Sequence, residues 1–223
     1  MMNIVIFDLD GTLLNTLGDL HICFNYAIGQ FGYPQRSLDE IKSFVGNGIR
    51  MAIERALPHK VNDDEMSQIV DVFKSYYIEH MNEHTVPYDG IIDMLKVLKR
   101  MGYKTAVVSN KYDDAVKALC KKYFGDLIDI AIGEGYGVNK KPSPDGILKV
   151  LDELGCGEIK RNNIVYVGDS EVDIQTAKNA DIPCISVLWG FKDRKFLEMN
   201  GASVFAEIPD DIIKIIEKKL YLE

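Results

Sequence analysis

The stretch IVIFDLDGTLLNT, residues 4–16, ends an apolar run with two aspartates that stand one residue apart. Residues 4–7 are β-branched or aromatic and predict a short buried strand. Side chains two residues apart in an extended chain project to the same side, so Asp8 and Asp10 are expected to point the same way. Two like charges this close repel each other unless a positive charge lies between them. An Asp-Gly turn at Gly11 would explain the second aspartate only, so the pair indicates chemistry.

The composition is ordinary for a soluble globular protein. The chain has 223 residues, of which 47% are hydrophobic and 27% are charged, enough to bury a core. Its 34 acidic and 26 basic residues give a formal net charge of -8. This balance argues against binding to nucleic acid or to an anionic membrane, because such binding depends on lysine and arginine. A small anionic substrate stays compatible with it, since a site can be locally positive.

The sequence also indicates a reducing compartment. The cysteines are far apart and form no Cys-x-x-Cys pair, so we expect reduced thiols rather than disulfides or a zinc site. The first strand begins almost at once, without the basic region of a signal peptide. No apolar run has the length needed to span a bilayer. We therefore expect a cytoplasmic protein.

Residues 16–86 predict helices throughout. Thr16 followed by Asp19 has the spacing of a capping box, as has Ser37 followed by Glu40. Apolar residues recur at helical spacing behind each of these starts.

Strands alternate with helices in the remainder of the chain. We expect strands at 104–108, 128–132, 164–167 and 185–188, and helices at 93–101, 113–123, 144–154, 172–180 and 210–219. This alternation implies parallel βαβ units with right-handed crossovers. The prediction is an α/β fold with a Rossmann-like parallel sheet core, residues 1–15 and 87–223. A small α-helical domain, residues 16–86, is inserted after the first strand.

Three of the predicted strands end in polar residues. Asp8 follows the first, Ser109-Asn110-Lys111 follows the second, and Asp169 follows the strand at 164–167. Ligands of open α/β sheets bind at the carboxyl ends of the strands, so we expect these three ends to converge. Asp173 stands one helical turn after Asp169 and is expected to pair with Ser170 in a capping box, whether or not it serves the site as well.

A cluster of carboxylates calls for a cation. Mg²⁺ prefers oxygen ligands and is often shared with a substrate phosphate. Ser109 and Asn110 stand where a strand passes into a helix, whose first amides favour an anion, although Ser109 could instead be a helix N-cap. Lys141 offers a positive charge in the segment NKKPSP, where Pro142 and Pro144 restrict the backbone. A solvated loop is the ordinary alternative for such a lysine.

Four motifs in order, FDLDGTLLNT, VVSNK, KKPSPDG and VYVGDSEVD, resemble those of the haloacid dehalogenase-like superfamily of phosphohydrolases. The resemblance covers nearly the whole chain, and the helical insert is similar to the family's small α-helical cap domain. The segments VGNGIRMAIERAL, VPYDGI and VSNK more narrowly resemble the phosphoglycolate phosphatases and their close relatives. Asn15 departs from the family pattern, in which many members have aspartate, but it lies outside the catalytic set.

The resemblance implies a Mg²⁺-dependent phosphatase with an aspartyl-phosphate intermediate. Asp8 would be the nucleophile, and Asp10 would protonate the leaving oxygen and later activate water. Asp8, the backbone carbonyl of Asp10, and Asp169 would hold Mg²⁺, with Asp173 in support. The phosphoryl oxygens would be bound by Ser109, Asn110, Thr12 and Lys141, the last of which would also orient the nucleophile.

Among possible substrates, phosphoglycolate is the one we expect first from the resemblance. Arg50, with Asn47 in the loop before it, could meet a substrate carboxylate from the cap, although a surface role for Arg50 is favoured. Pyrophosphate, a sugar phosphate or a nucleotide are alternative substrates. A β-phosphoglucomutase-like phosphotransferase is a further alternative. A non-catalytic phosphate-binding module is disfavoured, because Asp10 would then have no duty.

Overall fold

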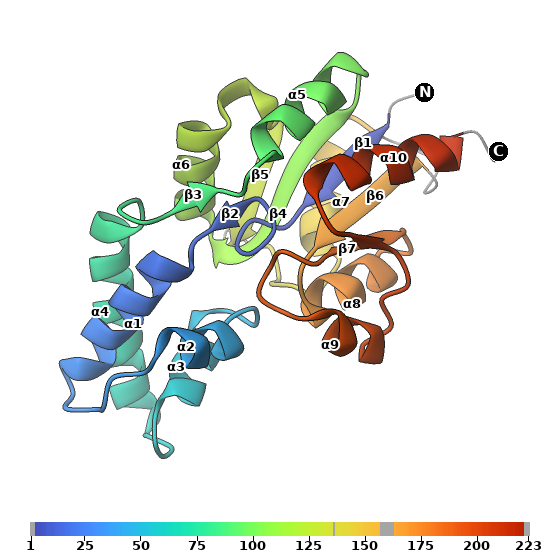
Figure 1. Cartoon of the computed structure of the whole chain (residues 1–223). Coiled ribbons are helices and arrows are strands. Elements are labelled where there is room, and N and C mark those ends of the chain that lie inside the picture. Colours follow the sequence, from blue (N-terminus) through green and yellow to red (C-terminus); the bar gives the residue numbers. More distant parts are fainter. Residues whose placement is uncertain (1–2, 136, 157–162, 221–223) are drawn as a thin grey trace. The chain divides into compact units, whose positions relative to one another are not determined.

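The computed structural model describes residues 3–135, 137–156 and 163–220 (Figure 1). The chain divides into two compact units, one of residues 1–13 and 87–223 and one of residues 14–86. The first boundary lies two residues before the position expected from the sequence, because the short strand β2 (Leu14–Asn15) belongs to the second unit and pairs with β3 (Val86–Pro87).

The first unit is built on a parallel sheet. Within the described residues its strand order is β5-β4-β1-β6-β7-β8, and each neighbouring pair is parallel. This confirms the predicted α/β class. Residue Ile4 of the central strand is in register with Lys104 on one side and Ile164 on the other. The strands are β1 (Ile4–Phe7), β4 (Lys104–Tyr112), β5 (Ile130–Glu134), β6 (Ile164–Gly168), β7 (Cys184–Val187) and β8 (Phe205–Ala206).

Helices cover both faces of this sheet. All of β1 is buried, as is typical of a strand that is covered on two sides. Ile4 and Ile6 share one apolar cluster with Ile147 and Ala177 from two of the helices. No helix formed by the described residues is long and apolar enough to cross a membrane. The helices of this unit are α5 (Ile91–Arg100), α6 (Asp113–Tyr123), η1 (Gly125–Leu127), α7 (Asp145–Glu153), α8 (Glu171–Asn179), α9 (Arg194–Met199) and α10 (Pro209–Leu220).

Strand β4 is longer than its sequence predicts. The apolar run ends at Val108, but the strand continues to Tyr112, which pairs with Glu134 of β5 after a register shift. Helix α6 therefore has Tyr112 as its N-cap, and the alternative reading of Ser109 as a helix N-cap is wrong. Pairing with a neighbouring strand, which local hydrophobicity does not reveal, sets this boundary.

The second unit consists mainly of helices, as predicted for this segment. Helices α1 and α4 pack against each other, with the ring centroids of Phe24 and Phe73 4.8 Å apart. The helices are α1 (Leu17–Gly29), α2 (Leu38–Phe44), α3 (Ile49–Ala56) and α4 (Asp63–His80). Figure 1 shows them in blue to teal.

One of the two predicted capping boxes of this unit is confirmed. The carboxylate of Glu40 accepts from the Ser37 backbone N–H at 2.7 Å, and the Ser37 hydroxyl accepts from the Glu40 N–H at 3.3 Å. The box expected at Thr16 and Asp19 is wrong, because Thr16 makes no side-chain cap. The buried Asp19 carboxylate instead accepts from the backbone N–H groups at His84 (2.8 Å) and Thr85 (2.9 Å). It thereby joins the two ends of the helical segment.

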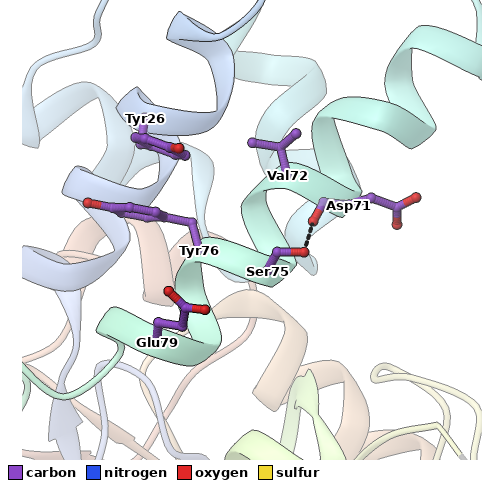
Figure 2. A pocket seen from close by; sticks show the side chains of 6 residues that line it. All are labelled: Tyr26, Asp71, Val72, Ser75, Tyr76 and Glu79. Carbon is purple, nitrogen blue, oxygen red and sulfur yellow. Dashed lines mark hydrogen bonds between the residues drawn. The ribbon is translucent and has the colours of Figure 1, made fainter.

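A hollow of about 410 Å³ lies on the surface of α1 and α4 (Figure 2). The rings of Tyr26 and Tyr76 stack there with centroids 3.8 Å apart. The remaining lining residues are Asp71, Val72, Ser75 and Glu79, so the hollow has two carboxylates and no basic side chain. This lining does not suit a phosphate ester, whose charge is negative.

Candidate active site

The strand order brings the predicted polar residues to one edge of the sheet. Because β1 lies between β4 and β6, the carboxyl ends of these three strands are neighbours. Asp8 directly follows β1, and its backbone N–H donates to the carbonyl oxygen of Val167 in β6 at 2.8 Å. Carboxylate oxygens of Asp8, Asp169 and Asp173 all lie within 4.8 Å of one another, and all three residues are buried. The structure therefore brings together three of the predicted acidic residues.

Lys141 supplies a positive charge to this cluster. Its ammonium group donates to Asp8 Oδ1 and to Asp173 Oδ1, both at 2.7 Å, and to the hydroxyl oxygen of Tyr166 at 3.1 Å. The Tyr166 hydroxyl in turn donates to the carbonyl oxygen of Val108 at 2.9 Å. The side chain of Lys141 is only 4% exposed, so this is not the solvated loop lysine of the alternative interpretation.

Asn110 contacts the backbone of Lys141. Its side-chain amide donates to the carbonyl oxygen of Lys141 at 3.1 Å, and its side-chain oxygen accepts from the Lys141 N–H at 2.7 Å. The side chain thus holds the backbone of Lys141 in place, and the phosphate contact expected for Asn110 stays a prediction. Ser109, one residue earlier in β4, is also buried, and its hydroxyl accepts from the Lys111 N–H at 3.3 Å.

Asp173 uses both of its carboxylate oxygens. Oδ1 accepts from Lys141, while Oδ2 accepts from the Ser170 hydroxyl at 2.6 Å and from the Ser170 N–H at 3.1 Å. The predicted contact between Ser170 and Asp173 is therefore present. With these contacts Asp173 orients the lysine, and it remains near enough to Asp8 and Asp169 to add to their negative field.

Residues 189–191, which the sequence analysis did not single out, lie next to Asp169. The backbone N–H of Phe191 donates to Asp169 Oδ2 at 2.6 Å, and the indole N–H of Trp189 donates to the carbonyl oxygen of Thr12 at 3.0 Å. A Cβ atom at Gly190 would lie 2.3 Å from Asp169 Cβ, so a residue with a side chain does not fit there. The available signal was position, because residues 189–191 follow β7, another strand that ends at the same edge.

Lys111 is a second lysine of the site to which the sequence reading assigned no role. Its ammonium nitrogen lies 3.0 Å from Asp10 Oδ1, and its side chain is only 4% exposed. Lys111 follows Ser109 and Asn110 at the polar end of β4. This position at a strand end was the signal that the sequence offered.

The remaining predicted residues are placed as follows. Thr12 is buried, and its hydroxyl oxygen has no hydrogen-bond partner among the residues that the structure describes. In the helical unit, Arg50 is exposed and pairs with Asp63 in the first turn of α4 at 2.5 Å. Asn47 lies in the loop before α3. No disulfide joins any of the four cysteines, as expected, and burial raises the pKa of Cys120 to about 12.

Burial is the largest influence on the pKa values of Asp8 and Asp169. It raises the pKa of Asp8 to about 7, against the lowering effect of Lys141 and with a further increase from Asp173. Burial, together with Asp173 and Asp8, also raises the pKa of Asp169 well above its usual value. Burial lowers the pKa of Lys141, but the carboxylates of Asp173 and Asp8 outweigh it and raise this pKa well above the usual value.

The charges and the ligand atoms of the site show whether its residues fit a divalent cation. Four carboxylates, those of Asp8, Asp10, Asp169 and Asp173, meet two ammonium groups, so negative charge is in excess. The clustered ligand atoms are all carboxylate oxygens, which a hard cation such as Mg²⁺ prefers to nitrogen or sulfur donors. The residues therefore fit a Mg²⁺ ion.

Comparison with known proteins places the chain among phosphatase sequences. The model of the haloacid dehalogenase-like hydrolases matches residues 5–187. A phosphoglycolate phosphatase of Aquifex aeolicus is 30% identical over 220 residues, which cover 98% of this chain and 99% of that protein. A phosphoglycolate phosphatase of Pseudomonas savastanoi pv. phaseolicola is 32% identical over 220 residues, 96% of this chain and 78% of its own.

Solved structures show the same similarity. A provisionally assigned phosphoglycolate phosphatase from Lactobacillus delbrueckii subsp. bulgaricus superposes with a TM-score of 0.91 and is 36% identical, covering 96% of this chain and 98% of its own. CbbY from Rhodobacter sphaeroides, solved with xylulose 1,5-bisphosphate, has a TM-score of 0.73 at 24% identity and covers 94% and 95% of the two chains.

Proposed function

Since this chain belongs to the haloacid dehalogenase-like hydrolase family, we propose that it hydrolyses a small phosphomonoester by way of a phosphoryl group on Asp8. Phosphoglycolate is the first substrate to test, because the curated relatives at about 30% identity carry that activity in their names. The observation that carries the proposal is the buried Asp8 carboxylate, held at 2.7 Å by Lys141 beside two further acidic residues.

The reaction has two steps. A carboxylate oxygen of Asp8 forms a bond to phosphorus while the bond from phosphorus to the ester oxygen breaks, and Asp10 gives its proton to that leaving oxygen. Water then attacks the aspartyl-phosphate and loses a proton to Asp10. Phosphate is released, the Asp8 carboxylate is restored, and Asp10 is again the protonated acid. Asp10 stands two residues after the nucleophile and is partly exposed, as a group that exchanges protons with water requires.

Lys141 makes the first step electrostatically feasible. A carboxylate and a phosphate dianion repel each other, and a preorganised cation at the nucleophile reduces this repulsion. Asp173, Tyr166 and the side chain of Asn110 hold the lysine from three directions, so its charge does not have to be reoriented during the reaction. The Ser109 and Thr12 hydroxyls, together with Asn110 and Lys141, are the proposed ligands of the phosphoryl oxygens.

A Mg²⁺ ion would be held by Asp8, Asp169 and the backbone carbonyl of Asp10, with Asp173 supporting them. When bound, it would supply positive charge to the transferring phosphoryl group and keep Asp8 ionised. Phe191 fixes Asp169 for this purpose through the 2.6 Å hydrogen bond to Oδ2.

The test is phosphate release from a panel of phosphoesters with Mg²⁺ or with EDTA. The wild type should release phosphate with Mg²⁺ only, with phosphoglycolate ahead of pyrophosphate, sugar phosphates and nucleotides. Asp8→Asn should be inactive, whereas the exposed control Asp64→Asn should match the wild type. Activity retained by Asp8→Asn would refute the nucleophile, and equal activity in EDTA would refute the metal.

A phosphotransferase would give a different result on the same panel. It would isomerise a glucose phosphate without releasing phosphate. The structural similarity to a protein solved with a sugar bisphosphate is at 24% identity and supports the fold only. Phosphatase activity therefore stays the proposal, and the panel includes glucose phosphates as its control.

A further inference from the structure

We propose that Lys111 selects substrates that carry a carboxylate on the leaving group, next to the ester oxygen. The inference rests on the proposed function, because it takes Asp10 as the acid that meets the leaving oxygen. It adds the residue that distinguishes a phosphorylated hydroxy acid from a neutral phosphoester of the same size.

The position of Lys111 at Asp10 is the first observation. The ammonium nitrogen lies 3.0 Å from Asp10 Oδ1, from a side chain that is 4% exposed. To give up its proton, Asp10 must lie within about 2.6–3.2 Å of the leaving oxygen. In phosphoglycolate the carboxylate carbon is two covalent bonds from that oxygen. A leaving group seated at Asp10 therefore places its carboxylate within reach of the Lys111 ammonium.

The distribution of charge is the second observation. Lys141 is engaged on the nucleophile side by Asp8 and Asp173, so its charge serves the phosphoryl group. The acidic groups of the cluster would repel a further anion on the substrate. Lys111, on the Asp10 side, offers that anion a partner, and its burial makes the interaction stronger than it would be in water.

A neutral leaving group cannot form the ion pair between the Lys111 ammonium and a substrate carboxylate. A hydrogen bond to a charged group contributes more than one between neutral groups. We therefore expect phosphoglycolate to exceed its neutral analogue by about 10- to 100-fold in kcat/KM. A lysine that only held Asp10 in place would affect both substrates equally.

The experiment compares phosphoglycolate with its carboxamide, carbamoylmethyl phosphate, which has the same shape and no charge on the leaving group. The enzyme is assayed with Mg²⁺ as wild type, Lys111→Met and Lys111→Gln. The control Lys121→Met removes an exposed lysine from α6, the helix that follows the same strand. Wild type and Lys121→Met should prefer the carboxylate, and both Lys111 variants should lose that preference.

Lys111→Gln keeps a hydrogen-bond donor near Asp10. If Lys111→Met does not fold, the result for Lys111→Gln decides the test. A preference that survives in Lys111→Gln overturns the inference. So does an equal loss of activity on both substrates, which would mean a positioning role, or a wild type without any preference. Failure of the proposed function looks different, because the wild type would then release phosphate from no ester in the panel.

Discussion

Replacing Asp8, the proposed nucleophile, by asparagine should stabilise the metal-free protein at pH 8. Burial raises the pKa of Asp8 from 3.8 to about 7, so the ionised carboxylate is disfavoured in the folded chain. This rise corresponds to ~4 kcal/mol, since each pH unit is worth about 1.4 kcal/mol. Asparagine removes the buried charge, and its shape is that of the protonated acid.

The sign of the pH dependence follows from the same shift. Because the folded pKa exceeds the unfolded one, the folded protein binds more protons between about pH 4 and pH 7. The ionised Asp8 carboxylate lowers the free energy of unfolding by its full amount above pH 7, and this loss disappears as the pH falls toward 4. In EDTA, the contribution of this carboxylate should therefore make the wild type more stable at pH 5.5 than at pH 8. Asp169, whose pKa is also raised by burial, adds to the same trend.

The assay is urea unfolding at pH 8 and at pH 5.5, in EDTA and in Mg²⁺. In EDTA at pH 8 we expect Asp8→Asn to be more stable than the wild type by ~1 to 4 kcal/mol, the upper figure being the full shift. Its pH slope should be smaller than that of the wild type. Mg²⁺ should stabilise the wild type more than the variant, because the ion binds ionised Asp8. A variant that is less stable than the wild type in EDTA at pH 8 would refute the reasoning.

Three further perturbations have expected outcomes. Lys141→Met should lower kcat/KM by about a thousandfold or more because the nucleophile loses its cation, while Lys140→Met, at an exposed position, should change it less than twofold; similar losses in both would contradict the assignment. Gly190→Ala places a Cβ 2.3 Å from Asp169 Cβ and should weaken Mg²⁺ binding in calorimetry, with ~1 to 3 kcal/mol lost in stability; unchanged Mg²⁺ affinity would refute this. Asp19→Ala leaves the buried N–H of Thr85 and the partly buried N–H of His84 without their acceptor and should cost ~2 to 4 kcal/mol in urea unfolding, a result that an unchanged midpoint would disprove.

The strand pattern carried the prediction of the fold and of the acidic pair. Apolar runs at residues 4–7 and 164–167 end in Asp8 and Asp169, and parallel strands have their carboxyl ends at one edge. Two residues some 160 positions apart could therefore be placed near each other before any coordinate was known. Lys141 needed the family resemblance in addition, because an isolated lysine in a loop has no distinctive local pattern.

Side-chain partners far apart in the chain were outside the reach of that reasoning. Asn110 holds the backbone of Lys141, 31 positions later, and Asp19 accepts from Thr85, 66 positions later. The sequence spacing had suggested a capping role for Asp19, and it gave no sign of the contact between Asn110 and Lys141. The capping expectation used a neighbour along the chain, whereas burial selected a partner in space.

By itself, the sequence determined the class of fold, the helical segment after the first strand, and which carboxylates follow strands, because periodicity and strand ends are local properties. Only the tertiary structure decided that β4 runs on to Tyr112, that Lys111 lies at Asp10, and that Phe191 holds Asp169. These features depend on strand pairing and on hydrogen bonds between buried groups, and a buried polar group takes whichever partner packing brings to it.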